Sequence, residues 1–290
     1  MVILLATGLR LSYEFLLFGG IAAGLAGLAG FGRWRSHPWQ ITNIALLGGL
    51  VVASLLLCAL VANTGLRLGL PVADPFLAGG DAHLGLDVRR VTHTVAAFPS
   101  GSTVLYWLYF ASGLMCVAGV GWSLVRGDRT GLWQVLATIV IAMQATAIIS
   151  IFLPAQGATA YFGLDLLQGN GLPHGAGTYA LEAFDHFYRG TGLLVTMADI
   201  NGIVCFPSFH TVMALIFLQS FARSALRWPA VILSALTILS TIPMGGHYAT
   251  DILGGIAIWF CSACLATRAS WSSSASTPRA AWPQGSAVPA

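Results

Sequence analysis

Lysine is absent from this 290-residue chain, and charged residues of any kind are scarce. Asp, Glu, Lys and Arg together make up 8% of the sequence, and all 13 basic residues are arginine. A soluble domain carries charge on about a quarter of its residues, so the composition excludes an ordinary soluble protein. The net charge of +3 is small and dispersed, which gives no reason to expect a nucleic-acid partner.

Cysteine is also sparse, and its placement argues against a disulfide framework. Four of the five cysteines lie in apolar runs, and Cys205 precedes the Pro207-Ser208-Phe209-His210 cluster. Cys261-x-x-Cys264 matches a metal or redox spacing, but within a membrane helix we expect these thiols to be packing residues. A cleavable signal peptide is not expected either, because the first apolar stretch lacks a charged start and a cleavage site.

Long apolar runs fill most of the chain, and 57% of all residues are hydrophobic. They predict an all-α, polytopic membrane helix bundle of about six to seven transmembrane helices, within a lipid bilayer. The expected spans are about 11–31, 41–63, 102–125, 131–153, 207–224, 229–244 and 249–267.

Residues 64–100 are too apolar for a solvated loop and too interrupted to span a membrane. We therefore expect short interfacial helices there, on the side of the active site. Asp74, Asp81 and Asp87 lie in this segment. They either cap helices, which we favour, or bind a cation, for which no EF-hand spacing is present.

Arginine placement predicts the orientation of the bundle. Eight arginines lie in the loops after spans one, three and five and in the tail, whereas the other side has five arginines and nine of the ten acids. The arginine-rich side is expected in the cytoplasm, so the protein would lie in a bacterial inner membrane with its active site facing the periplasm. We divide the chain into an amino-terminal region (1–100), a catalytic bundle (101–268) and a disordered tail (269–290).

Two polar clusters interrupt the apolar runs between residues 205 and 255. Pro207-Ser208-Phe209-His210 precedes an apolar run, with Pro and Ser at positions typical of a helix start. Gly245-Gly246-His247 follows the next run, and Asp251 lies four residues after His247. Two antiparallel helices would return His247 to the membrane face where His210 lies, with Asp251 one helical turn from His247.

These residue types suit phosphoryl transfer. A carboxylate at Asp251 can hold one imidazole nitrogen of His247 and leave the other free to attack. Ser208, the free N–H groups of its helix start and the backbone around Gly246 offer an anion site. His210, His247 and Asp251 alone provide too few ligands for a closed zinc shell, so we expect no metal and no cofactor.

At these positions the sequence resembles the type 2 phosphatidic acid phosphatase superfamily. Pro207-Ser208-x-His210 matches the family's second motif, and Ser240, His247 and Asp251 match its third, with Thr241 standing where that motif has Arg. His247-Tyr248-x-x-Asp251 followed by Gly254-Gly255 is more similar to the aureobasidin-resistance branch, which includes inositol phosphorylceramide synthases.

The resemblance implies catalytic roles for His247 as nucleophile, His210 as acid and base, and Asp251 as the residue that orients His247. The family's first motif supplies Lys and Arg to the phosphate. This chain has no Lys, and Arg189 is the only basic residue between 154 and 206. We expect Arg189 to bind phosphate with Ser208 and Gly246, the alternative being a surface salt bridge to Asp185.

The expected substrate is a membrane lipid that carries a phosphate ester. A phosphatase would pass the phosphoryl group to water, whereas a transferase like the inositol phosphorylceramide synthases would pass a phospho-headgroup to a polyol or lipid alcohol. Tyr161, Tyr179 and Asp199 are candidates for an acceptor pocket. The third alternative is a transporter or a lipid-binding protein without catalysis, against which the complete Ser, His, His and Asp set argues.

Overall fold

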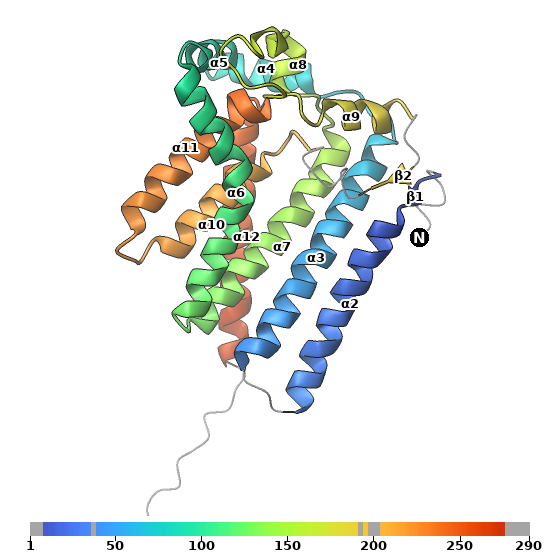
Figure 1. Ribbon diagram of the computed structural model, residues 1–290, viewed down its shortest axis with the longest axis vertical. Coiled ribbons are helices and arrows are strands. Elements are labelled where there is room, and N and C mark those ends of the chain that lie inside the picture. Colours follow the sequence, from blue (N-terminus) through green and yellow to red (C-terminus); the bar gives the residue numbers. More distant parts are fainter. Residues whose placement is uncertain (1–7, 36–38, 191–193, 197–203, 276–290) are drawn as a thin grey trace, which may run out of the picture.

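The computed structural model describes residues 8–35, 39–190, 194–196 and 204–275, and these are almost entirely helical (Figure 1). Among them, six helices are long and apolar enough to cross a membrane. They are α2 (Tyr13–Trp34), α3 (Trp39–Leu66), α6 (Pro99–Val125), α7 (Arg129–Phe152), α11 (Arg227–Gly245) and α12 (Ala249–Ala275). The predicted all-α membrane bundle is confirmed.

The prediction of a full span at 207–224 is wrong. Helix α10 (Phe209–Phe221) has 13 residues, which at about 1.5 Å per residue reach only about 20 Å, short of a hydrocarbon core of about 30 Å. The predicted span also included residues 207–208 and 222–224, which lie outside the helix at its two ends. Helix α10 therefore starts below the short helices that cover one end of the bundle (Figure 1).

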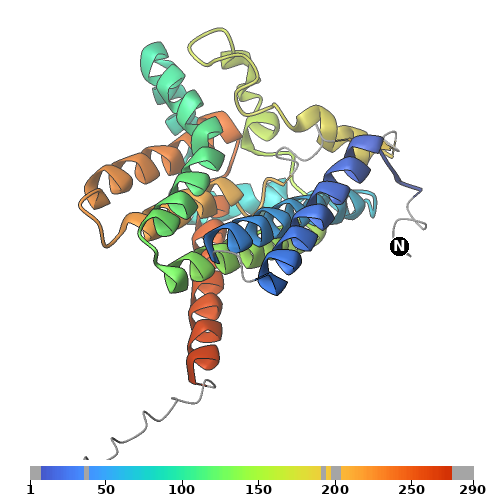
Figure 2. The same ribbon diagram turned by 60° about the horizontal axis from the view of Figure 1, so that its bottom comes forward.

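Helix α10 occupies the middle of the bundle, where it packs against α6, α7, α11 and α12. Its Val212 and Ile216 are fully buried against Ala142 and Met143 of α7. Helices α2 and α3 pair at the other side of the molecule, with α3 joined to α7 (Figures 1 and 2). Large apolar side chains on the outside of the bundle, such as Leu16 of α2 and Leu114 of α6, are exposed, as lipid-facing residues are.

Short helices form a layer over one end of the bundle (Figure 1). Helices α4 (Asp74–His83) and α5 (Val88–Ala96) lie within 64–100 and confirm the expected short helices there. The remaining members are α8 (Ala158–Phe162), the 3-10 helix η1 (Leu164–Leu167) and α9 (Leu181–Tyr188). Strands β1 (Arg10–Leu11) and β2 (Leu194–Val195) pair in parallel beside this layer and connect the first helix to it.

The α2–α3 and α6–α7 connections lie at the end opposite the short-helix layer (Figure 1). Arg33, Arg35, Arg126 and Arg129 lie at or beside these connections. These two arginine-bearing connections and the layer are thus on opposite ends of the bundle, as the sequence predicts. Helix α12 continues to Ala275, beyond the predicted boundary at 268. The rest of the predicted tail lies outside the described residues.

Candidate active site

Ser208 begins helix α10, as the sequence predicts. Its backbone is extended, and its Oγ accepts a hydrogen bond of 3.4 Å from the Thr211 N–H. Its own N–H donates to the Asp251 carbonyl at 3.0 Å, which ties the start of α10 to α12. Ser208 is fully buried. The Thr211 hydroxyl also donates to Ser208 Oγ, at 3.2 Å. Both lone pairs of this oxygen are therefore used, and its proton is available to an acceptor.

Gly246 ends helix α11 in the left-handed conformation, with φ of 69°. Its N–H donates to the Ile242 carbonyl at 3.0 Å, and the His247 N–H donates to Thr241 at 3.2 Å. Both N–H groups therefore close the helix, and the bond from Gly246 to Ile242 is that of an αL cap. The Gly246 N–H is thus used within the helix end, and phosphate binding by the backbone around Gly246 stays a prediction. Gly246 also shapes the turn that presents His247.

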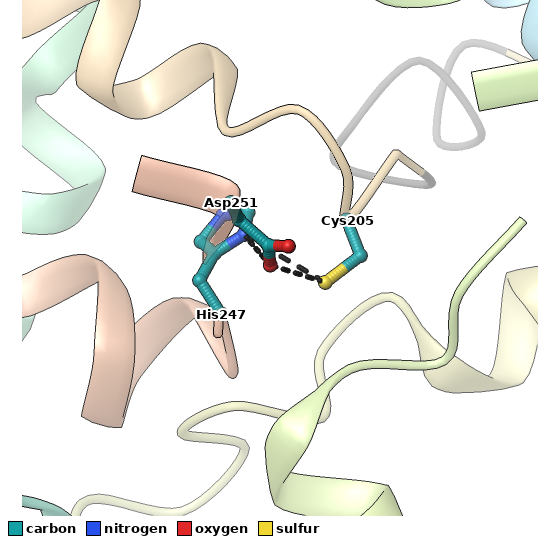
Figure 3. A group of neighbouring side chains, drawn as sticks. All are labelled: Cys205, His247 and Asp251. Carbon is teal, nitrogen blue, oxygen red and sulfur yellow. Dashed lines mark hydrogen bonds and ion pairs between the residues drawn. The ribbon is translucent and has the colours of Figure 1, made fainter. Parts of the chain in front are cut away.

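His247 and Asp251 form the expected pair. His247 Nδ1 lies 3.1 Å from Asp251 Oδ2, and both side chains are buried (Figure 3). The same Oδ2 accepts the Tyr248 N–H at 2.9 Å. Helix α12 begins at Ala249, so Asp251 lies in its first turn and reaches back to the two residues before it. When Nδ1–H donates to the carboxylate, Nε2 has a free lone pair.

Cys205 is a third member of this cluster, and sequence reasoning did not assign it a role there. Its Sγ lies 3.2 Å from Asp251 Oδ2 and 3.7 Å from His247 Nδ1 (Figure 3). Burial, together with the Asp251 carboxylate, holds the pKa of the Cys205 thiol well above its usual range, so the thiol is protonated and donates to Asp251. The three potential ligand atoms lie within 4.8 Å of one another, close enough to hold a metal ion.

His210 lies across from this cluster, at the start of α10. Its ring centroid is 6.2 Å from that of His247. The Tyr109 ring of α6 stacks on His210 with centroids 4.0 Å apart and planes 20° apart. The Tyr109 hydroxyl is hydrogen-bonded to the Tyr179 hydroxyl, and burial raises the pKa of Tyr179 to about 12. Two neutral tyrosines thus fix the orientation of His210, a role with no signal in the local sequence.

Ser208, His210, His247 and Asp251, which belong to the two resembling motifs, therefore converge on one site. A family model for the PAP2 superfamily matches residues 75–265, about two thirds of the chain. The chain belongs to the PAP2 superfamily. Comparison with curated proteins and with solved structures found no match. Family membership and the apolar helices identify an integral membrane protein of the lipid-phosphatase type.

Two buried aspartates of α4 bind the segment that carries His247 in this PAP2 protein. Asp81 accepts the first two N–H groups of α12, from Ala249 at 2.9 Å and Thr250 at 2.7 Å, and also the Thr250 hydroxyl at 2.7 Å. It therefore caps a helix far away in the sequence. Asp74 accepts the Tyr248 hydroxyl at 3.0 Å and the N–H groups of Gln156 and Gly157.

Of the two interpretations of the interfacial aspartates, the capping one is confirmed for Asp81 and for Asp87. Asp87 caps α5 by accepting the Arg89 N–H at 3.1 Å. Asp74 and Asp81 contact α12 and the loop after α7, so residues before position 100 contribute directly to the site.

The glycine pair after Asp251 allows α12 to approach the start of α10. A Cβ at Gly255 would lie 2.5 Å from the Ser208 carbonyl oxygen, and a Cβ at Gly254 would lie 2.9 Å from the Phe206 ring. Any side chain at Gly255 would push the helix that carries Asp251 away from Ser208. The pair therefore has a packing function within the site.

Arg189 forms the surface pair that was the alternative to phosphate binding. Its guanidinium lies 3.4 Å from Asp185, and its side chain is 69% exposed. Asp185 also accepts a hydrogen bond from the Gln156 side chain at 3.1 Å. Arg67 lies close by, since a Cβ at Gly190 would be 2.8 Å from its Nη1. Arg189 thus lies at the edge of the site and does not contact His247.

A small cavity of about 20 Å³ adjoins His247 and Cys205, enough for about one water molecule. Gln156 and Tyr179 also line it, so one of the predicted acceptor-pocket residues faces the site. Tyr161 instead lines a separate groove of about 450 Å³ that α4, α5 and α8 form, and Arg89 lies in the same groove. Asp199 lies outside the described residues.

Proposed function

We propose that this PAP2 superfamily member cleaves a phosphate ester of a membrane lipid through a phosphohistidine at His247. The observation that carries the proposal is the buried pair in which Asp251 Oδ2 lies 3.1 Å from His247 Nδ1. This contact fixes the tautomer whose Nε2 has the free lone pair. A second histidine, 6.2 Å away between ring centroids, lies within reach of a leaving group on the phosphorus.

In the first step Nε2 of His247 attacks the phosphorus, and the P–O bond to the lipid alcohol breaks. His210 donates a proton to the departing oxygen. The resulting phosphoimidazole carries positive charge, which the Asp251 carboxylate stabilises. In the second step His210 takes a proton from water or from an acceptor hydroxyl, whose oxygen attacks the phosphorus and frees His247.

Ser208 is the proposed hydrogen-bond donor to the phosphoryl oxygens, because its hydroxyl proton is not used by the cap. Arg189 is the proposed cation, and Arg67 beside it is a second. Arg189 must exchange its partner Asp185 for phosphate, which costs little because exposed ion pairs contribute only about 0–1 kcal/mol. No metal ion takes part in this scheme, since the arginines and the helix start supply the positive field.

Transfer to a second alcohol is the other candidate for this site. The pattern His247-Tyr248-x-x-Asp251 with Gly254-Gly255 favours it, because this pattern is similar to the inositol phosphorylceramide synthase branch. Such an enzyme would pass the phospho-headgroup to a polyol or to a lipid alcohol. The opposite positions of the short-helix layer and the arginine-rich loops support a location in a bacterial inner membrane with the site on the periplasmic side.

Purified protein incubated with candidate phospholipids, with and without inositol or other polyols, tests both candidates. Release of inorganic phosphate indicates hydrolysis, whereas a product that forms only with a polyol indicates transfer. His247→Ala should abolish turnover, and His210→Ala should lower it by at least about 100-fold because acid–base catalysis is lost. His93→Ala, at an exposed position of α5, is the matched control and should behave like wild type.

A labelled substrate should leave an acid-labile phosphoryl group on wild-type protein and none on His247→Ala. Near-normal turnover by His247→Ala on a lipid substrate would show that the phosphohistidine scheme is wrong.

A further inference from the structure

Cys205 lies beside the candidate nucleophile but takes no part in the proposed phosphohistidine chemistry. Its sulfur, the His247 Nδ1 and the Asp251 Oδ2 form a triangle with sides of 3.7, 3.2 and 3.1 Å (Figure 3). Thiolate, imidazole and carboxylate are the ligand types that Zn²⁺ takes in proteins. The triangle also joins two distant parts of the chain, since Cys205 precedes α10 whereas Asp251 belongs to α12.

The triangle has the dimensions of one face of a tetrahedral metal site. With about 2.3 Å from zinc to sulfur and about 2.0–2.1 Å to nitrogen or oxygen, ligand atoms lie roughly 3.3–3.6 Å apart. All three observed separations are close to this range, so an ion fits between the atoms after small side-chain shifts. The fourth position can hold water, because a cavity of about 20 Å³ borders both Cys205 and His247.

An independent observation also indicates a missing partner at this place. The second carboxylate oxygen of Asp251, Oδ1, is buried and has no hydrogen-bond partner among the described residues. Buried polar atoms in proteins are nearly always satisfied by protein, water or an ion. A cation at Oδ2 would neutralise this carboxylate, and an ion that binds both oxygens would satisfy Oδ1 directly.

We propose that Cys205, His247 and Asp251 form a binding site for a divalent cation of the Zn²⁺ type, and that occupation of this site inactivates the candidate nucleophile. The binding half of the inference depends only on the three side chains. The inhibitory half rests on the proposed function, because it requires His247 to be the nucleophile.

Inhibition follows from the nitrogen that the metal uses. In the metal-free site Nδ1–H donates to Asp251, and Nε2 has the lone pair that attacks phosphorus. A cation at Nδ1 needs a lone pair on Nδ1, so the imidazole proton must move to Nε2. Protonated Nε2 has no lone pair and can no longer attack. The Cys205 thiol loses its proton to solvent as the metal–sulfur bond forms. The ion also breaks the hydrogen bond between His247 and Asp251.

A Co²⁺ titration of the purified protein in detergent tests the binding half without any enzyme assay. Thiolate bound to Co²⁺ gives a charge-transfer absorption, which should appear with one equivalent of ion and be absent from Cys205→Ala. Cys205→Ser, which keeps the size and polarity of the side chain, should also lack it and covers the case in which the alanine variant does not fold. The double variant Cys261→Ala/Cys264→Ala is the matched control and should keep the band.

Zn²⁺ inhibition of turnover tests the second half. Relative to its own uninhibited rate, Cys205→Ala should need at least about tenfold more Zn²⁺ for half inhibition, since loss of even an outer-shell partner weakens metal sites by about 10–100-fold.

The binding half is overturned by the absence of the band, by its persistence without Cys205, or by its loss in the double control variant. The inhibitory half is overturned when bound ion leaves turnover unchanged, or when turnover requires the ion. Because the Co²⁺ titration needs no substrate, failure to find any lipid phosphatase activity would refute the proposed function while leaving the metal site testable.

Discussion

Removal of the Asp81 carboxylate should loosen the segment that carries His247 from a position outside the catalytic cluster. In Asp81→Ala the N–H groups of Ala249 and Thr250 and the Thr250 hydroxyl lose their acceptor. These N–H groups belong to the first turn of α12, where no carbonyl of the same helix can replace the carboxylate.

The expected destabilisation is about 2–4 kcal/mol. Hydrogen bonds to charged groups contribute about 1.5–3 kcal/mol each, and Asp81 accepts three at a site where it is 3% exposed. The sum is reduced because Thr250 is only half-buried, so water replaces part of the loss, and because removal of the carboxylate also removes the cost of burying it. Asp81→Asn keeps one acceptor oxygen and should be affected less.

Thermal unfolding in detergent at a fixed scan rate measures the effect as an apparent midpoint, since membrane proteins often unfold irreversibly. Asp128→Ala is the matched control. Asp128 also caps a membrane-spanning helix, by accepting the Gly131 N–H at 2.8 Å, but it is exposed and should cost about 0.5–2 kcal/mol. Turnover should fall in Asp81→Ala more than substrate affinity does. An Asp81→Ala midpoint equal to that of Asp128→Ala, with normal turnover, would refute this account.

Three other perturbations test separate parts of the site. Arg189→Lys should lower turnover more than affinity if the guanidinium fork binds developing charge, whereas unaltered kinetics would shift the search to other arginines. A chelator should not abolish wild-type activity; if it did, and one divalent ion restored activity, the metal-free scheme would be wrong. A membrane-impermeant thiol reagent should label Leu166→Cys but not Arg126→Cys in intact cells, and the reverse pattern would invert the topology. Tyr109→Phe keeps the ring stacked on His210 and should retain more turnover than Tyr109→Ala; equal losses would mean that the hydroxyl, rather than the stacking, matters.

Local signals in the sequence could predict the helices and part of the site. The helix start at Ser208 was predictable because its cap depends on Thr211, three residues away. The contact between His247 and Asp251 was predictable because the two residues are four positions apart, although α12 itself begins only at Ala249. By contrast, the 13-residue length of α10 was not predictable from the apolar run, because the run does not show at which residue the helix ends.

Contacts between distant segments could not be predicted from the same signals. Asp81 accepts a hydrogen bond from Ala249, which is 168 residues away in the sequence. Cys205 is 46 residues from Asp251. An aspartate in an interfacial helix has the same local pattern whether it faces water, a cation or the start of another helix. The hydrogen bond from the Gly246 N–H to Ile242 is by contrast a local contact, set by the left-handed end of α11.

The distribution of charge in this site requires a source of positive charge for binding phosphate, and the arginines are the candidates. Asp74, Asp81 and Asp251 all bind residues between His247 and Thr250, so three of the ten acids in the chain surround one short segment. Carboxylates so placed stabilise a positively charged phosphoimidazole but repel the incoming phosphate. The start of α12 offsets part of that repulsion, because its positive dipole end faces Asp81. The remainder must be offset by cations that approach with the substrate, and Arg189 and Arg67 are the candidates proposed for this role. Substitution of each in turn therefore distinguishes a site that attracts phosphate through its arginines from one that depends on Ser208 and the helix start alone.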